Sequence, residues 1–228
     1  MGNIHINKSL DPDRRIFQYL SFYELVDLLK FNQTFFTRAD HPQRQDLFSK
    51  DVVPDFESNR ITLQSWSLAA DDVLAEWETQ HSPHPGVCIV SSVRALSQSL
   101  FTDDATRIYI ELARPAARAQ DALWCTSPRR GRTKALPRTQ SDGLHAIAIS
   151  KRSHAPANLS PAGMHLLVDL RTLLTEVVIP PKAPARFMEL VTKLVQESTW
   201  ITVTRASSTL AAGVVSRLPK RNKINTGP

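Results

Sequence analysis

The side chains best suited by type to contact a polyanion lie in residues 114–143, a basic stretch that also contains Trp124. Arginine and lysine neutralise phosphates, and an aromatic ring offers a surface on which a base can stack. The residues that we expect to contact a nucleic acid are Arg129, Arg130, Arg132 and Lys134. The alternative is a solvated loop, because prolines interrupt the stretch and no regular apolar pattern runs through it.

Other reactive side chains are spaced in ways that indicate no metal site and no nucleophile. His81 and His84 lie three residues apart in a proline-containing turn, but no third ligand of suitable type is near them. A solvated turn is the favoured interpretation, and we expect no bound metal. The chain also has no nucleophile-elbow sequence and no glycine-rich phosphate loop.

The elements that must position such residues begin with a strand–helix–strand unit. The apolar and aromatic run Ile16–Leu20 predicts a strand, and Thr34–Thr37 predicts a second one. Between them, Ser21 and Glu24 have the spacing of a capping box. Leucines at helical spacing predict a helix over Ser21–Lys30 whose apolar side carries Leu25, Leu28 and Leu29.

Further strands outnumber helices and do not alternate with them regularly. The predicted strands are Ile61–Ser67, Val87–Val90, Arg107–Leu112, Leu144–Ile149, Met164–Leu170, Glu176–Ile179 and Trp200–Thr204. The predicted helices are Ala70–Thr79, a short one capped by Ser92, and Pro184–Glu197. This pattern indicates an α+β fold with a mixed, mostly antiparallel central sheet, and not a doubly wound nucleotide fold.

We expect one domain over residues 14–212, with the basic, proline-rich stretch at about 114–143 as an insertion. Residues 1–13 are expected to be a flexible N-terminus. Residues 213–228 are expected to be a basic, disordered tail, because they lack apolar periodicity.

Length and charge narrow the protein class without revealing a function. The chain has 228 residues and a net charge of +6, but residues 1–110 carry net −5 and residues 111–228 carry net +11. The basic half permits an anionic partner, and charge matching between the halves is the alternative. Two cysteines are too few for a disulfide framework, and no apolar run is long enough to span a membrane. We therefore expect a cytoplasmic protein with no membrane contact.

The order of these elements resembles family 2971 of bacterial domains of unknown function. The similarity covers about residues 16–210, and its motifs are short. The matching segments are Tyr19–Ser21, Leu25–Leu29, Phe35–Asp40, Ser65–Ser67, Trp77, Gly86–Ile89, Gly163–Leu170, Val177–Pro181, Phe187–Val195 and Ser208–Leu210.

The opening unit also resembles the first motif of ADP-ribosyltransferase folds, in which an aromatic residue and a hydroxyl two positions later meet NAD. The resemblance implies NAD as the ligand and an NAD-type cleft lined by Tyr19, Ser21, Arg38, Trp66, Trp77 and His145. All of these residues except Arg38 also have a plainer alternative. Ser21 serves as a helix cap, Tyr19 and the tryptophans pack in the core, and His145 is a satisfied strand histidine.

The resemblance fails where the family carries its acidic strand. At the two glutamate positions this chain has Ser141 and Gly143, and His145 stands at the arginine position; Asp142 could substitute only in a shifted register. A carboxylate is needed to stabilise positive charge on the ribose as the glycosidic bond breaks. The resemblance therefore implies a conflict, defence or effector protein whose degenerate nucleotide cleft binds rather than catalyses. The alternatives are an active ADP-ribosyltransferase-like enzyme and a nucleic-acid-binding module.

Overall fold

The strands of the computed structural model form one mixed sheet. The structure describes residues 3–39, 60–70, 77, 86–113, 143–150 and 160–206. The strands in these ranges are β1 (Ile4–Ile6), β2 (Arg15–Leu20), β3 (Gln33–Arg38), β4 (Ile61–Ser67), β5 (Val87–Ser92), β6 (Thr106–Ala113), β7 (Gly143–Ser150), β8 (Gly163–Leu167), β9 (Glu176–Ile179) and β10 (Val203–Arg205).

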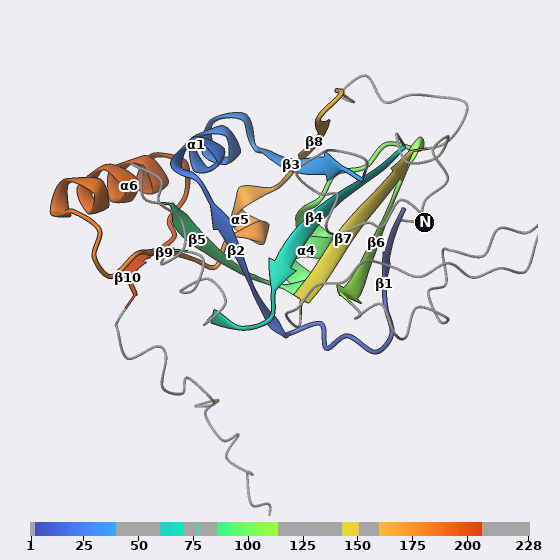
Figure 1. The fold of residues 1–228 in the computed structure, drawn as a ribbon, viewed down its shortest axis with the longest axis horizontal. Coiled ribbons are helices and arrows are strands. Elements are labelled where there is room, and N and C mark those ends of the chain that lie inside the picture. The colour runs from blue at the N-terminus through green and yellow to red at the C-terminus, as the bar shows by residue number, and fades with distance from the viewer. Residues whose placement is uncertain are drawn as a thin grey trace, which may run out of the picture.

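The strand order confirms the predicted mixed, mostly antiparallel sheet. Along the main path it is β1-β6-β7-β4-β2-β5-β9-β10, while β3 pairs with β4 and with β8. Of the pairings between described strands, β1 with β6 and β9 with β10 are parallel, and the rest are antiparallel. Most partners are distant in sequence, so the sheet places side by side strands that lie far apart along the chain (Figure 1).

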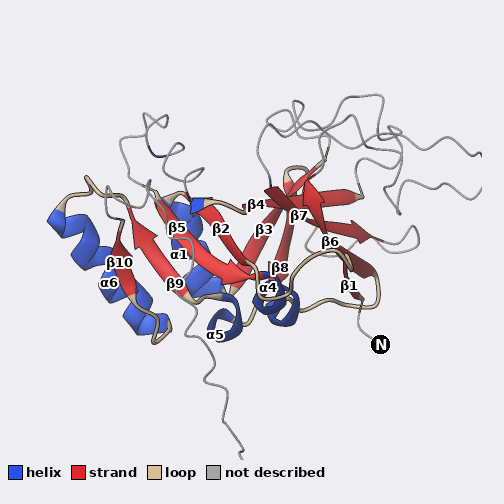
Figure 2. Ribbon diagram, turned by 90° about the horizontal axis from the view of Figure 1, so that it is seen from below, coloured by secondary structure: helices blue, strands red, loops and turns tan. Residues whose placement is uncertain are grey.

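The helices whose bounds the structure describes pack against one face of this sheet. Those with described bounds are α1 (Phe22–Phe31), α4 (Val93–Ser99), α5 (Leu170–Leu173) and α6 (Ala185–Ser198). Their apolar side chains join those of the strands in one buried cluster that includes Ile16, Ile89, Leu96 and Val191. Figure 2 shows α6 alongside β9 and β10, and α4 and α5 close together near the middle of the sheet.

Alternation along the strands assigns every side chain to one of two faces. We call the helix-covered face, which carries Ile16, Trp66 and Leu144, the core face. The opposite face carries Tyr19, and we call it the Tyr19 face. Across β2 and β5 it also carries Cys88, the partner of Tyr19 in the ladder.

Helix α1 forms as the sequence predicts. The hydroxyl of Ser21 accepts the Glu24 backbone N–H at 3.3 Å, and the Glu24 carboxylate accepts the Ser21 N–H at 2.7 Å. This capping box satisfies two backbone donors at the helix start. The predicted apolar side is confirmed, with Leu25, Leu28 and Leu29 all buried.

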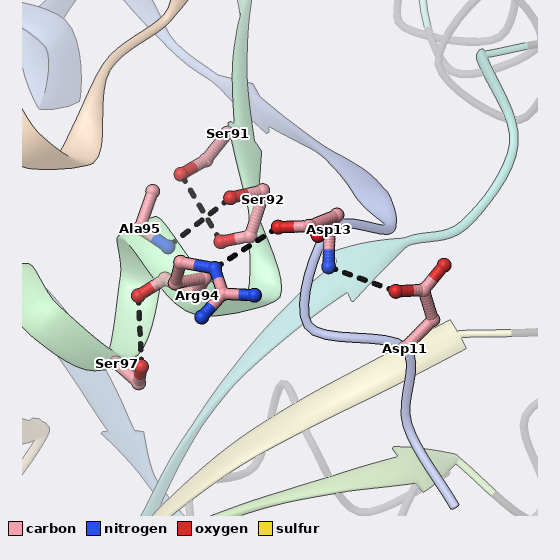
Figure 3. A network of polar contacts seen from close by, with 7 residues as sticks. All are labelled: Asp11, Asp13, Ser91, Ser92, Arg94, Ala95 and Ser97. Carbon is pink, nitrogen blue, oxygen red and sulfur yellow. Dashed lines mark hydrogen bonds and ion pairs between the residues drawn. The ribbon is translucent and has the colours of Figure 1, made fainter. Parts of the chain in front are cut away.

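Helix α4 is tied to the chain that precedes β2 (Figure 3). The Ser92 hydroxyl accepts the Ala95 N–H at 3.1 Å, as the predicted cap requires. Arg94 Nε donates to Asp13 Oδ1 at 2.9 Å, and the guanidinium of Arg94 lowers the pKa of the Asp13 carboxyl. The Arg94 N–H also donates to the Pro12 carbonyl at 2.8 Å.

The N-terminal segment differs from the flexible start that the sequence suggests. Residues 4–6 form β1, which pairs in parallel with β6 about a hundred residues later in the chain, at Ile4↔Ile108 and Ile6↔Ile110. Ile4 and Ile6 pack against the core, and His5 stacks on Tyr109 with ring centroids 5.1 Å apart. A strand of three residues with so distant a partner leaves almost no local signal.

Several expectations fall outside the described residues. They include the basic insertion at 114–142 and the tail beyond residue 206. Of the helix expected over Ala70–Thr79, only Ala70 and Trp77 are described, and both are helical. None of the helices within the described ranges is both long and apolar enough to cross a bilayer.

Candidate functional site at the fork of the sheet

The sheet forks along one edge of β4. Two strands meet this edge at its two ends: β2 pairs with it at Phe17↔Ser67, and β3 pairs with it at Thr37↔Leu63 and Arg38↔Thr62. Among the described strands, no ladder pair forms on this edge of β4 between Leu63 and Ser67. We call the opening between β2 and β3 along β4 the fork.

Ser65 lies at the centre of the fork. The Ile61 carbonyl accepts from Ala39 N–H, on the side of β3, while the Arg60 carbonyl accepts from Ser150 N–H, on the side of β7. Backbone direction alternates along a strand, so the N–H and C=O of Ser65 point toward the fork, as those of Ile61 do. The Ser65 side chain, in contrast, stands on the Tyr19 face, where its partner across β7 is His145.

On the core face, Gln64 closes the fork. Its amide donates to Gln18 Oε1 on β2 at 3.3 Å and to Thr34 Oγ1 on β3. Its carbonyl oxygen accepts the Trp66 indole N–H at 3.1 Å. Gln64 is 3% exposed and Trp66 is 2% exposed. Trp66, expected from the family resemblance to line the ligand cleft, thus lies in the core, where its indole N–H helps to hold the fork together.

Tyr19 lies on β2 on the opposite face, and a close approach fixes its ring. A Cβ added to Gly86 would overlap the Cζ and Oη atoms of Tyr19, so the ring lies directly over this glycine. Tyr19 packs with Phe17 and Trp77 against Cys88 and Val90. The structure therefore brings together two of the residues expected in the cleft, Tyr19 and Trp77.

Trp77 contributes a buried hydrogen-bond donor beside Tyr19. Within the part of the chain that the structure describes, its indole Nε1 has no hydrogen-bond partner, although the atom is buried. Leaving a buried donor unsatisfied costs about 1–3 kcal/mol, so such a group marks a position where an acceptor would be favourable.

His145 stands on the Tyr19 face across the fork. It is 6% exposed, and its Nδ1 lies 3.2 Å from the Ser65 hydroxyl. Continuing the Phe17↔Ser67 register by two residues would set Tyr19 opposite Ser65. Tyr19 thus lies beyond the fork, on the same face as Ser65 and His145.

Two of the expected site residues are not part of this arrangement. The hydroxyl of Ser21 already accepts the Glu24 N–H of the capping box, as the plainer interpretation expects. Arg38 pairs with Thr62 and so stands on the core face, half-buried. Neither residue shares the strand positions that bring Tyr19 and His145 onto one face.

One neighbour of His145 was not predicted from the sequence. Glu111 on β6 is the ladder partner of His145 and stands on the Tyr19 face. The alternation of Arg107–Leu112 places Tyr109 and Glu111 on one side of a strand, but it does not reveal which strand lies beside them. Only the three-dimensional register shows that a carboxylate faces His145.

The structure does not test the other residues that the sequence singled out. Arg129, Arg130, Arg132 and Lys134 lie outside the described residues, as do Ser141, Asp142 and the His81–His84 pair. Among the described residues, no group of three His, Cys, Asp or Glu side chains is placed to hold a metal ion.

Comparison with known proteins gives a weak structural likeness. The structure is similar to Thermus sp. 2.9 DarT in complex with carba-NAD+, at a TM-score of 0.43 and 12% identity over 88% of this chain and 99% of that one. It is similar to the same protein in complex with NAD+ (TM-score 0.42, 12% identity, 87% and 98% of the chains) and with ADP-ribosylated ssDNA (0.42, 13%, 87% and 97%). No family model matches the chain, and no curated protein matches its sequence. Membership of family 2971 stays a hypothesis.

Proposed function

We propose that this protein binds a nucleotide of the NAD type on the Tyr19 face, at the fork of the sheet. The observation that carries the proposal is the arrangement on the Tyr19 face: the Ser65 hydroxyl lies 3.2 Å from His145 Nδ1, and across the fork Trp77 packs beside Tyr19. These groups supply the kinds of contact that a nucleotide needs: an aromatic surface, a hydroxyl and an imidazole that can carry positive charge.

Each group has a part in the proposed complex. The ring of Tyr19, held over Gly86, stacks with a base or a nicotinamide ring. An amide or carbonyl oxygen of the ligand accepts the buried Trp77 N–H.

We propose that the protein binds this ligand without cleaving its glycosidic bond. Ser141 and Gly143 stand where the resembling family carries its glutamates, and cleavage of the glycosidic bond requires a carboxylate near the ribose. A role as a binding or inhibitory protein in bacterial conflict follows from the resemblance and is part of the same proposal.

The test is calorimetric titration of the full chain with NAD, together with thermal unfolding. At 100 times Kd, the ligand stabilises the protein by about 2.7 kcal/mol. Tyr19→Ala is expected to abolish binding. The matched control is Tyr23→Ala on α1, whose side chain is 68% exposed. It is expected to bind as the parent does.

Two results would contradict the proposal. Absence of any heat or thermal shift at millimolar NAD would remove the ligand class. Steady release of nicotinamide from NAD would favour the alternative of an active ADP-ribosyltransferase-like enzyme over that of a binding protein.

A further inference from the structure

Large apolar side chains are exposed around the short segment that joins β8 to α5. Leu167 is exposed at the end of β8, and its carbonyl accepts the backbone N–H of Phe101, a second exposed residue, at 2.9 Å. The next residue, Val168, donates its N–H to the Asn32 carbonyl at 2.8 Å, and Asn32 directly follows the exposed Phe31 at the end of α1. Backbone hydrogen bonds thus bring together exposed residues from three separate parts of the chain.

Trp200 adds a fourth exposed side chain at the same segment. Within the described part of the chain it is the most exposed large apolar residue, at 87%. The guanidinium carbon of Arg171, on α5, lies 4.5 Å from the centroid of its ring. The preceding residue, Thr199, is buried, and both its N–H and its hydroxyl donate to the Val195 carbonyl. The indole is therefore held in solvent by an anchored backbone. We call Phe31, Phe101, Leu167 and Trp200 the apolar patch.

The size of the apolar patch matches the centre of an interface between proteins. The aromatic side chains of Phe31, Phe101 and Trp200 are 63%, 59% and 87% exposed. At about 150–250 Å² for each whole side chain, they leave roughly 400–500 Å² of apolar surface in water, to which Leu167 adds. A standard interface covers about 800 Å² of each partner, and about 56–65% of that area is apolar. Patches of this size on a soluble protein mark interaction sites.

Charged side chains of opposite sign lie at different places around the apolar patch. Asp103 and Asp104 are exposed and follow Phe101 within three residues. Arg171 is exposed and lies against Trp200. A surface with an acidic side and a basic side is complementary to itself, because a two-fold axis brings the acidic side of one copy against the basic side of the other.

We propose that two copies of this chain associate about a two-fold axis through the apolar patch, with Trp200 buried between them and Arg171 of each copy facing the two aspartates of the other. Tryptophan and arginine are the residues that most often dominate the binding energy of an interface. The other charged pair nearby, Lys30 with Glu197 at 3.4 Å, is already formed within one copy. Neither sign of charge prevails on this surface, which favours a second copy over a strongly acidic or basic partner. The proposal does not depend on the proposed function.

The first experiment measures the mass of the full chain by sedimentation velocity over a range of concentrations. The parent protein is expected to be a dimer at micromolar concentrations. Trp200→Ser is expected to raise the dimer Kd about 30-fold or more, as loss of a dominant interface residue does. The control Leu190→Ser removes an exposed apolar side chain from α6, eight residues or roughly 12 Å before the helix ends, and is expected to remain a dimer. Both changes are at exposed positions, so both proteins are expected to keep the melting temperature of the parent.

A charge exchange tests the two-fold arrangement itself. One variant is Arg171→Glu, and the other combines Asp103→Lys with Asp104→Lys. A dimer of either variant alone would bring like charges together, so each is expected to raise the dimer Kd about 100-fold or more. Mixed in equal amounts, the two variants are expected to form a dimer again, because the exchanged charges on one chain then face the opposite charges on the other. This rescue also shows that neither variant is unfolded.

Three outcomes would overturn the proposal. A parent protein that stays monomeric up to about 100 μM has no such interface. If that monomer bound vesicles of phosphatidylglycerol and Trp200→Ser did not, the apolar patch would contact a membrane instead. A parent dimer that Trp200→Ser leaves intact would have its interface elsewhere. Failure of the mixed charge variants to associate would reject the pairing of Arg171 with the two aspartates.

Discussion

At the scale of single residues, Gly86 determines where the Tyr19 ring lies. A side chain at this position would overlap the outer end of the ring, which is the flexible end of a side chain and can move aside. Gly86→Ala is therefore expected to keep the fold, with a melting temperature close to that of the parent, and to weaken NAD binding at least 10-fold. Calorimetry and thermal unfolding of the same preparation measure both effects.

The control is Gly163, a second glycine at which an added Cβ would overlap neighbouring atoms. A Cβ on Gly163 would overlap the backbone carbonyl of Phe36, which cannot move without disturbing the pairing of β3 with β8. Gly163→Ala is expected to lower the melting temperature clearly. If Gly86→Ala bound NAD as the parent does, the Tyr19 ring would not be part of the site.

We expect the proposed binding of NAD to depend on pH through His145. An imidazole with an ordinary pKa near 6.5 is charged below that pH and neutral above it. Affinity for NAD, whose phosphates are anionic, is therefore expected to fall as pH rises from about 6 to about 8.

The neutral variant His145→Gln tests this dependence, because glutamine does not titrate. It is expected to bind with the same reduced affinity at both pH values. Should the parent protein show a flat profile over this range, the histidine charge would have no part in binding.

At the scale of elements, the three strands β2, β3 and β4 are joined through one buried side chain, Gln64. Its amide and carbonyl satisfy Gln18, Thr34 and the Trp66 indole. Gln64→Leu removes all these partners at once, and leaving buried polar groups unsatisfied costs about 1–3 kcal/mol for each. The variant is expected to be destabilised by several kcal/mol in urea unfolding.

Trp66→Phe distinguishes the structural role of the Trp66 indole in the core from the ligand-binding role that the resemblance implies. It removes the N–H that Gln64 accepts and keeps an aromatic ring in the core. It is expected to lower the free energy of unfolding by about 1–3 kcal/mol and to leave the Kd for NAD unchanged. Loss of binding by a folded Trp66→Phe protein would restore the ligand role that the resemblance implies.

Asp169 supports the short helix α5 and adds a pH-dependent contribution to stability. Thr172 Oγ1 donates to its carboxylate at 2.6 Å, and this hydrogen bond lowers the pKa of Asp169 below its ordinary value of 3.8. A lowered carboxyl pKa stabilises the fold above the ordinary value, and this contribution is lost as pH falls through the lowered one. Asp169→Ala is expected to cost about 1 kcal/mol at pH 7 and clearly less once the pH lies below the lowered pKa of the carboxyl, measured by urea unfolding at a series of acidic pH values.

The local elements could be predicted from the sequence because their causes are local. The capping box at Ser21, the leucine spacing of α1, the Ser92 cap and the alternation of β4 all depend on residues a few positions apart. The fork could not be predicted, because it depends on which strands meet β4. Glu111 was missed for the same reason. Whether Trp66 lines the cleft or packs in the core stayed open, because strand alternation does not say which face is covered.

At the scale of the whole molecule, the charge asymmetry predicts a second kind of ligand. Residues 111–228 carry net +11, and Arg129, Arg130, Arg132 and Lys134 lie in the basic insertion. If they contact single-stranded nucleic acid, log K should fall steeply with log salt, by about 0.7 for each phosphate neutralised. Replacing the three arginines with alanine is expected to flatten this slope, measured by fluorescence anisotropy between 50 and 200 mM salt. Binding whose strength does not change with salt would reject this contact.

The strand order has a consequence for how the chain is made. The first three strands are synthesised early, yet β1 pairs with β6, β2 with β5, and β3 with β8 near residue 165. During translation, these strands emerge long before most of their partners exist. Pairings between distant segments form slowly, because closing long loops must precede the contacts that stabilise them. Folding should therefore wait for nearly the whole chain, and nascent chains should need protection from aggregation until β8 has left the ribosome.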